Sequence, residues 1–168
     1  MFRSIEVFLE KLMFASRWIM APFYFGLIIS LFMLLIVFLS EIFHFMINFQ
    51  INETDLIIFI LTLIDLSFAG NLLIIVIFSG YENFVSKINI DNHEDKPDWM
   101  GTVDFSGLKL KLISSIVAIS GIHLLKVFFA IERYTENQII LFIAVHLTFV
   151  VSGVLLAYMD SLVAKSKK

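Results

Sequence analysis

The sequence contains no cysteine, and charged residues are scarce in it. Without cysteine, disulfide bonds, thiolate metal sites and thiol nucleophiles are all excluded. Only 16% of the residues are charged, the net charge is -3, and the basic residues are scattered along the chain. The concentrated basic patch that nucleic-acid binding requires is therefore missing, and no nucleic-acid partner is expected.

Sequence motifs typical of enzymes are also missing. The sequence has no glycine-rich phosphate loop, no HExxH zinc helix and no serine nucleophile elbow. We therefore expect that the protein is not an enzyme and that it carries no cofactor.

Hydrophobic residues make up 60% of the chain, and the mean hydropathy is +0.94, well outside the range of ordinary soluble proteins. They come in long blocks, which predict an all-α integral membrane protein with a single membrane domain. The expected transmembrane helices cover residues 18–49, 55–80, 108–131 and 138–160. The third is the shortest uncharged run, and it spans only if Lys109, Lys111 and Lys126 extend their side chains toward headgroups.

Three segments outside these spans are more polar. Residues 1–16 have apolar side chains at helical spacing and predict an amphipathic helix that lies at the membrane interface. Residues 81–107 form a polar loop, and residues 161–168 form a basic tail. The long first span lacks a small-residue cleavage site, which indicates an uncleaved anchor.

The distribution of Lys and Arg predicts the orientation of the chain. With four spans, Lys126 and Arg133 fall on one side of the membrane and the other ten basic residues fall on the opposite side. Because basic residues are enriched in cytoplasmic loops, both termini and the long loop are expected in the cytoplasm. A three-span arrangement would carry the C-terminal lysines outside and spoil this asymmetry.

Ionisable residues inside the predicted spans are the main functional candidates. At about 1.5 Å of rise per residue, Asp65 lies roughly 15 Å deep, His146 about 12 Å and His123 about 10 Å from the same side. Lys126 is one helical step after His123 and can reach the same depth. An ionisable group at such depth costs about 2.5 to 3.5 kcal/mol on insertion scales and usually faces protein or a watered cavity. We call Asp65, His123, Lys126 and His146 the polar layer.

Two interpretations of the polar layer remain open. In the functional one, Asp65 and the histidines exchange protons or hold a cation in a pocket that opens to the outside. In the structural one, Asp65 only accepts a hydrogen bond or ion pair from His123, His146 or Lys126, which holds helices together. A metal site of Asp65, His123 and His146 is a weaker alternative, because no helix carries two ligands at i, i+3 or i, i+4 spacing. His44 is expected to face headgroups and His93 to be solvated in the loop.

Small and weakly polar residues predict where helices pack closely. Ser114, Ala118 and Gly121 repeat along one side of the third span, and His146, Gly153 and Ala157 along one side of the fourth. Asp160 continues the latter side and is expected to pair with Lys109 or Lys111 at the cytoplasmic end. The full set of packing candidates is Ser67, Gly70, Asn71, Ser114, Ala118, Gly121, Gly153 and Ala157.

Several segments of the chain resemble one family of membrane proteins. They are residues 80–86 (GYENFVS), 108–112 (LKLKL), 122–126 (IHLLK) and 146–152 (HLTFVVS), together with Pro22 before the first apolar block and Asp65 with Asn71 in the second. They are similar to the YqhA-like bacterial inner-membrane proteins. This resemblance implies a four-span protein of the plasma membrane, the bacterial inner membrane, and it carries no established activity or site residues.

Four short spans enclose little volume, so a path for a solute would form more naturally between subunits. The sequence therefore predicts a homo-oligomer in the lipid bilayer that passes or senses a proton or small ion through the polar layer. The alternative is a structural or accessory membrane protein that organises lipid or recruits a partner without transport.

Overall fold

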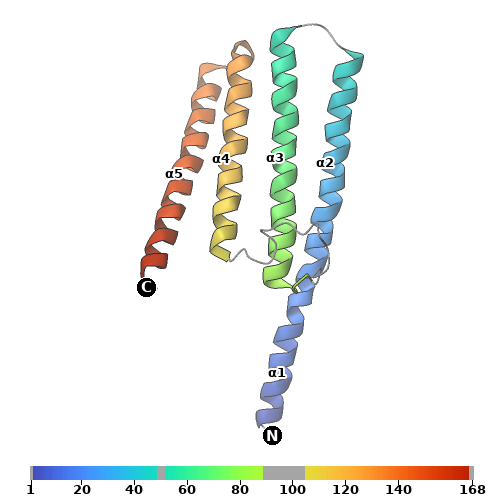
Figure 1. Ribbon diagram of the computed structural model, residues 1–168, viewed down its shortest axis with the longest axis vertical. Coiled ribbons are helices and arrows are strands. Elements are labelled where there is room, and N and C mark those ends of the chain that lie inside the picture. Colours follow the sequence, from blue (N-terminus) through green and yellow to red (C-terminus); the bar gives the residue numbers. More distant parts are fainter. Residues whose placement is uncertain (1, 49–51, 89–104, 167–168) are drawn as a thin grey trace.

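The chain folds into helices, as the computed structural model shows for the residues it describes, 2–48, 52–88 and 105–166 (Figure 1). Four of these helices are long and apolar enough to cross a membrane, which confirms the expected all-helical class and makes this a multi-pass membrane protein. The helices are α1 (Phe2–Ser16), α2 (Ala21–Ile47), α3 (Glu53–Phe84), α4 (Phe105–Phe129) and α5 (Glu136–Ser166), with short 3-10 helices η1 (Arg17–Met20) and η2 (Ile131–Arg133).

The four long helices stand side by side in the order of the chain rather than around a common centre (Figure 1). α3 packs against α2 on one side and α4 on the other, and α5 packs against α4. α2 and α5 are thus the two ends of the row. Both chain termini lie toward one edge of this layer, which we call the termini side, and the α2–α3 and α4–α5 connections lie at the opposite edge, the loop side.

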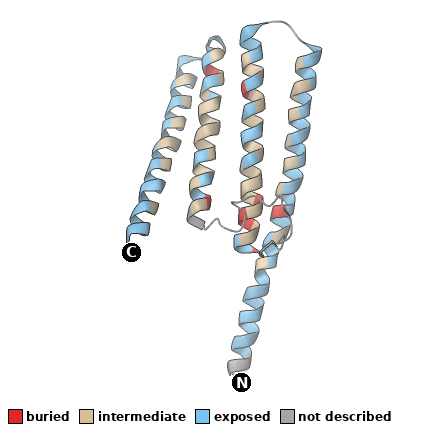
Figure 2. Cartoon of the chain, in the orientation of Figure 1, coloured by how far each residue is buried: buried red, intermediate tan, exposed pale blue. Residues whose placement is uncertain are grey.

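Few side chains are buried in this layer, as Figure 2 shows. The buried apolar residues of the described chain gather near the two edges of the layer, and α5 has none. In water such a surface would be unstable, but lipid tails are as apolar as leucine, so exposure to them costs little. The buried apolar residues are Tyr24, Leu61, Ile77, Val85, Leu108 and Val127.

The N-terminal segment forms a helix, α1, that projects from the termini side below α2 (Figure 1). All of its described side chains, from Ile5 to Ser16, are exposed. η1 joins it to α2, and Pro22 lies in the first turn of α2, where its missing N–H costs no helical hydrogen bond. The predicted position of α1 at a membrane interface stays a prediction.

The ends of α3 differ from those expected for the second span. Asn52, rather than Thr54 or Asp55, caps the helix, since its side-chain oxygen accepts a hydrogen bond of 3.1 Å from the Thr54 backbone N–H. At the other end the helix continues through Gly80 to Phe84. The polar loop expected over residues 81–107 is therefore shorter, and most of it lies outside the described residues.

Gly80 lies within α3, and the Tyr24 ring of α2 occupies the space beside it. A Cβ at position 80 would lie 2.6 Å from Tyr24 Cε1 and 2.9 Å from its hydroxyl oxygen. The ring also meets the Tyr81 ring edge-on, with centroids 6.1 Å apart. Glycine thus allows a close approach of α2 and α3 at the termini side instead of ending the helix.

Gly80→Ala is expected to destabilise the protein by about 1 to 3 kcal/mol, because the added methyl displaces a buried ring. Gly26→Ala is the matched control, since nothing lies within 4 Å of a Cβ at position 26. That change is expected to be neutral or to stabilise by up to about 1 kcal/mol, from helix propensity. Thermal unfolding in detergent checks both, and equal behaviour of the two variants would contradict the close contact.

Candidate functional site

An ion pair joins the two central helices. Lys126 Nζ of α4 lies 2.6 Å from Asp65 Oδ2 of α3 and donates a hydrogen bond to it. The Lys126 side chain is 18% exposed and that of Asp65 is 23% exposed, so the protein covers most of both side chains. A charge-assisted bond of this length in such a place is stronger than a surface pair.

Helix direction explains why these two side chains meet. Side chains on a helix tilt toward its N-terminus. α4 begins at the termini side, so Lys126, three residues before its last residue, leans inward from the loop side. α3 runs in the opposite direction, so Asp65 leans toward the loop side. The lysine therefore extends its charge into the layer rather than out to the nearest surface.

The second histidine of the polar layer is held by a serine. His146 Nδ1 of α5 lies 2.9 Å from Ser120 Oγ of α4, and that hydroxyl also lies 2.9 Å from the Val117 carbonyl oxygen. A hydroxyl has one proton, so where it donates to Val117, the imidazole donates from Nδ1 and Nε2 is left as an acceptor. Gly121 makes room for the ring, since a Cβ there would lie 3.5 Å from His146 Cε1.

His123 is exposed, and its ring packs against an aromatic ring of the neighbouring helix. The centroids of His123 and Phe142 are 5.3 Å apart and the planes are nearly perpendicular. The Tyr134 ring also meets Phe142 edge-on, with centroids 5.7 Å apart. An edge-on aromatic contact fixes the orientation of the imidazole while it leaves the ring nitrogens available.

These side chains share one groove, which we call the histidine groove. Asp65, Ser120, His123 and His146 line it together with apolar residues of α4 and α5, and its volume is about 450 Å³. The structure thus brings the two histidines and the carboxylate around one space, with Lys126 bound to the carboxylate. Within the described chain, no three His, Asp or Glu side chains are close enough to hold a metal ion together.

Asn71 lies in a different groove. It is six residues after Asp65, which is about 240° around α3. It is exposed and lines a groove of about 570 Å³ between α3 and α4, with Lys111, Ser114 and Ser115. The two serine hydroxyls donate to carbonyls of their own helix, to Leu110 and Lys111. The Asn71 amide is therefore the strongest polar group that this face presents in the middle of α3.

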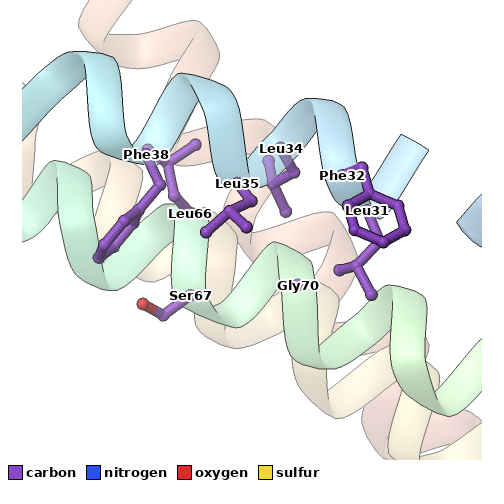
Figure 3. Close-up of a pocket in the computed structure, with 8 residues that line it drawn as sticks. All are labelled: Leu31, Phe32, Leu34, Leu35, Phe38, Leu66, Ser67 and Gly70. Carbon is purple, nitrogen blue, oxygen red and sulfur yellow. The ribbon is translucent and has the colours of Figure 1, made fainter. Parts of the chain in front are cut away.

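The small residues divide into contact and surface positions. A Cβ at Gly70 would meet Leu31 and Leu34 of α2, and one at Gly153 would lie 3.4 Å from Ile113 of α4. Ala118 is half-buried, whereas Ser67 and Ala157 are exposed. Figure 3 shows the pocket beside Gly70, whose volume is about 360 Å³. The Ser67 hydroxyl is the one side-chain oxygen in its lining, and it donates a hydrogen bond to the Leu63 carbonyl.

The expected ion pair at the termini side is not formed. Asp160 makes no ion pair with Lys109 or Lys111 within the described chain, and both lysines have other interactions. Both lysines are exposed. His44 is exposed near the end of α2, and His93 lies outside the described residues.

Two charged residues have an importance that the sequence did not indicate. Glu41 is half-buried within α2, two turns from its end, and so adds a second carboxylate at membrane depth. Arg17 is half-buried, and its Nε is buried without a hydrogen-bond partner among the described residues. The only sequence signal was position, since Glu41 interrupts an apolar run and Arg17 precedes one.

Asp65→Asn is expected to destabilise the protein by about 3 kcal/mol, because it leaves the Lys126 ammonium without its counter-charge. Lys126→Gln should cost a similar amount, and the double variant less than the sum, since it buries no unpaired charge. Chemical or thermal unfolding of the four proteins measures this coupling.

Arg133→Gln is the control for these variants. It removes the pair between Arg133 Nη2 and Asp55 Oδ1, 3.7 Å apart, in which both side chains are exposed. Its cost is expected to be below about 1 kcal/mol. Additive effects of Asp65→Asn and Lys126→Gln would show that the two groups do not interact in the membrane.

Comparison with known proteins places the chain in a family. No solved structure matches it. The sequence model of an uncharacterised protein family, UPF0114, matches residues 13–128, which include α2, α3 and all but one residue of α4. This covers more than half of the chain and confirms the resemblance to YqhA-like proteins. The chain is therefore a member of the uncharacterised family UPF0114.

Proposed function

We propose that this protein is a homo-oligomer of the bacterial inner membrane that passes or senses a proton or small ion through the polar layer. The role is not enzymatic. One observation carries the proposal: the ion pair between Asp65 and Lys126 borders a groove that also holds two histidines. Titratable groups gathered at membrane depth are typical of proton and ion pathways.

The ion pair is a natural switch. A proton on Asp65 removes its charge, and Lys126 then lies in a largely enclosed place without a counter-ion, which is unfavourable. The lysine side chain is long and flexible, so it can move toward headgroups on the loop side. His146 and His123 are suited to deliver or accept that proton, since one nitrogen of a neutral imidazole ring accepts a hydrogen bond while the other donates one. Proton binding would thus change the contact between α3 and α4.

The orientation supports an entry from outside the cell. The excess of Lys and Arg on the termini side favours cytoplasmic termini. The polar layer then lies in the half of the membrane nearer the outside, and Arg133 and Asp55 lie at that surface. The predicted interfacial position of α1 on the cytoplasmic side belongs to the same proposal.

Asp65→Asn is expected to abolish proton flux, because an amide cannot carry the proton. Flux is measured in liposomes with an internal pH-sensitive dye and an imposed pH gradient, and a decrease on the order of tenfold or more is expected. Asp65→Glu should retain flux because it keeps a carboxylate, and Arg133→Gln should leave flux unchanged. If Asp65→Asn matches the unsubstituted protein, or no flux exists, the transport proposal fails.

The open row favours assembly of several copies. The histidine groove opens at the surface of a single layer, so a closed path for an ion needs a second subunit. A separate observation also favours self-association. The Asn71 amide is exposed, and amides of transmembrane helices form hydrogen bonds between helices when lipid offers none. We place one contact between copies on the α3 face that carries Asn71, which holds copies together but lies away from the histidine groove.

Asn71→Leu is expected to weaken self-association by about 1 to 2 kcal/mol, since it removes the hydrogen bonds between copies. Single-molecule photobleaching of labelled protein in vesicles measures the oligomer distribution against protein density. Thr148→Val is the control, because this exposed hydroxyl already donates to the Ala144 carbonyl of its own helix. An unchanged distribution for Asn71→Leu would exclude this face as the interface.

The alternative function, an accessory protein without transport, is favoured by α1. This helix projects beyond the layer with its described side chains exposed, among them Phe8, Leu12 and Met13. Such an arm suits contact with lipid or with a partner protein. Absence of flux together with retained binding to lipid or to a partner would support this alternative.

A further inference from the structure

A second groove, which we call the apolar groove, lies between α2 and α3 on the termini side, away from the polar layer. Its volume is about 840 Å³, and its lining includes Ile28 and Phe32 of α2 and Ile74 and Phe78 of α3. Almost all of its lining surface is apolar. This apolar lining offers water no hydrogen-bond partners. Because the two helices cross the membrane, a hydrocarbon chain of a lipid is the natural filling.

The length of the apolar groove fits one leaflet of a bilayer. It runs along α2 from Ala21 to Phe32, which is about 16 Å at the helical rise. This is half of the hydrocarbon thickness of about 30 Å. Leu31 and Phe32 also line the pocket of Figure 3, so the groove meets a further apolar space near the middle of the layer.

A cation lies at the membrane-surface end of this groove. Arg17 is four residues before Ala21 in the 3-10 helix η1, about 8 Å farther toward the termini side. η1 packs against both α2 and α3, the two helices that form the groove. Arg17 is thus fixed at the level where a headgroup would lie if an acyl chain filled the groove.

The Arg17 guanidinium contacts an aromatic ring, and its Nε has no hydrogen-bond acceptor within the described chain. Its Cζ lies 3.7 Å from the centroid of the Phe14 ring, which orients the planar group. Its Nε is buried and has no hydrogen-bond partner in the described chain. A buried donor without an acceptor is unfavourable, and guanidinium groups bind phosphate oxygens in two-pronged geometry.

We propose that the apolar groove and Arg17 form a binding site for one anionic phospholipid. An acyl chain lies along α2 and α3 in the groove, and the phosphate accepts hydrogen bonds from Arg17. The lipid supplies both an apolar filling for the groove and an anionic partner for the guanidinium, whereas an apolar transmembrane segment would fill the groove without supplying that charge. The site is independent of the polar layer and of the proposed transport.

Native mass spectrometry of the full chain in neutral detergent tests the headgroup. The probes are dioleoyl phosphatidylglycerol and dioleoyl phosphatidylcholine. The unsubstituted protein is expected to bind phosphatidylglycerol more tightly, and Arg17→Gln to weaken that binding about tenfold and to erase the preference. Lys11→Gln, which removes an exposed charge of α1, should change it less than about twofold. Equal effects of the two variants would overturn the site, because they would indicate unspecific attraction.

A pair of tryptophan variants tests the groove. Ile28 lines it, whereas the neighbouring exposed Ile29 does not. Ile28→Trp should fill the groove and weaken binding of both lipids about tenfold, while Ile29→Trp should leave both unchanged. Similar results for the two positions would overturn the groove as the acyl-chain site. Displacement of phosphatidylglycerol by inorganic phosphate at equal concentration would also overturn it, because the site would then bind the anion alone.

Discussion

The ion pair between Asp65 and Lys126 is the interaction on which the arrangement of helices depends most. In a bilayer, apolar surface gives no drive for helix association, so directional contacts and close packing decide which helices meet. This pair joins α3 to α4, the two central helices, and so connects the α2–α3 half of the layer to the α4–α5 half. The contacts on either side are close approaches at glycine: Gly70 and Gly80 of α3 face α2, Gly121 of α4 faces α5, and Gly153 of α5 faces α4.

The sequence predicted the helices well because a bilayer imposes their length and composition. The four apolar blocks correspond to four long helices. The number of residues from a helix end gives the depth of a side chain, so the shared depth of Asp65, His123 and His146 was predictable, and these residues line one groove. Sequence could not give the order of helices in the layer. A helix that is apolar on all sides has no periodic pattern to show which face packs. The sequence therefore does not distinguish a row of helices from a closed bundle.

The partners of individual side chains were harder to predict for the same reason. The sequence left His123, His146 and Lys126 as possible partners of Asp65, and the structure shows that Lys126 is the one that pairs with it. His146 binds Ser120, which has no distinguishing sequence signal because serine is also common in helix contacts. The ends of α3 show the same limit: the Asn52 side chain caps its start, and the helix continues past Gly80, which packs against Tyr24.

The apolar and polar side chains on the surface of the layer need different partners. Apolar side chains such as Phe23 and Ile36 are satisfied by lipid tails, so their exposure demands no partner. Asn71 and Arg17 are not satisfied in this way, because an amide or a guanidinium needs acceptors or donors that hydrocarbon lacks. These residues lie in separate places, one on the middle of α3 and one beside the termini side of the α2–α3 groove. A protein neighbour and a lipid headgroup can therefore complete the layer at the same time, each where its chemistry is required.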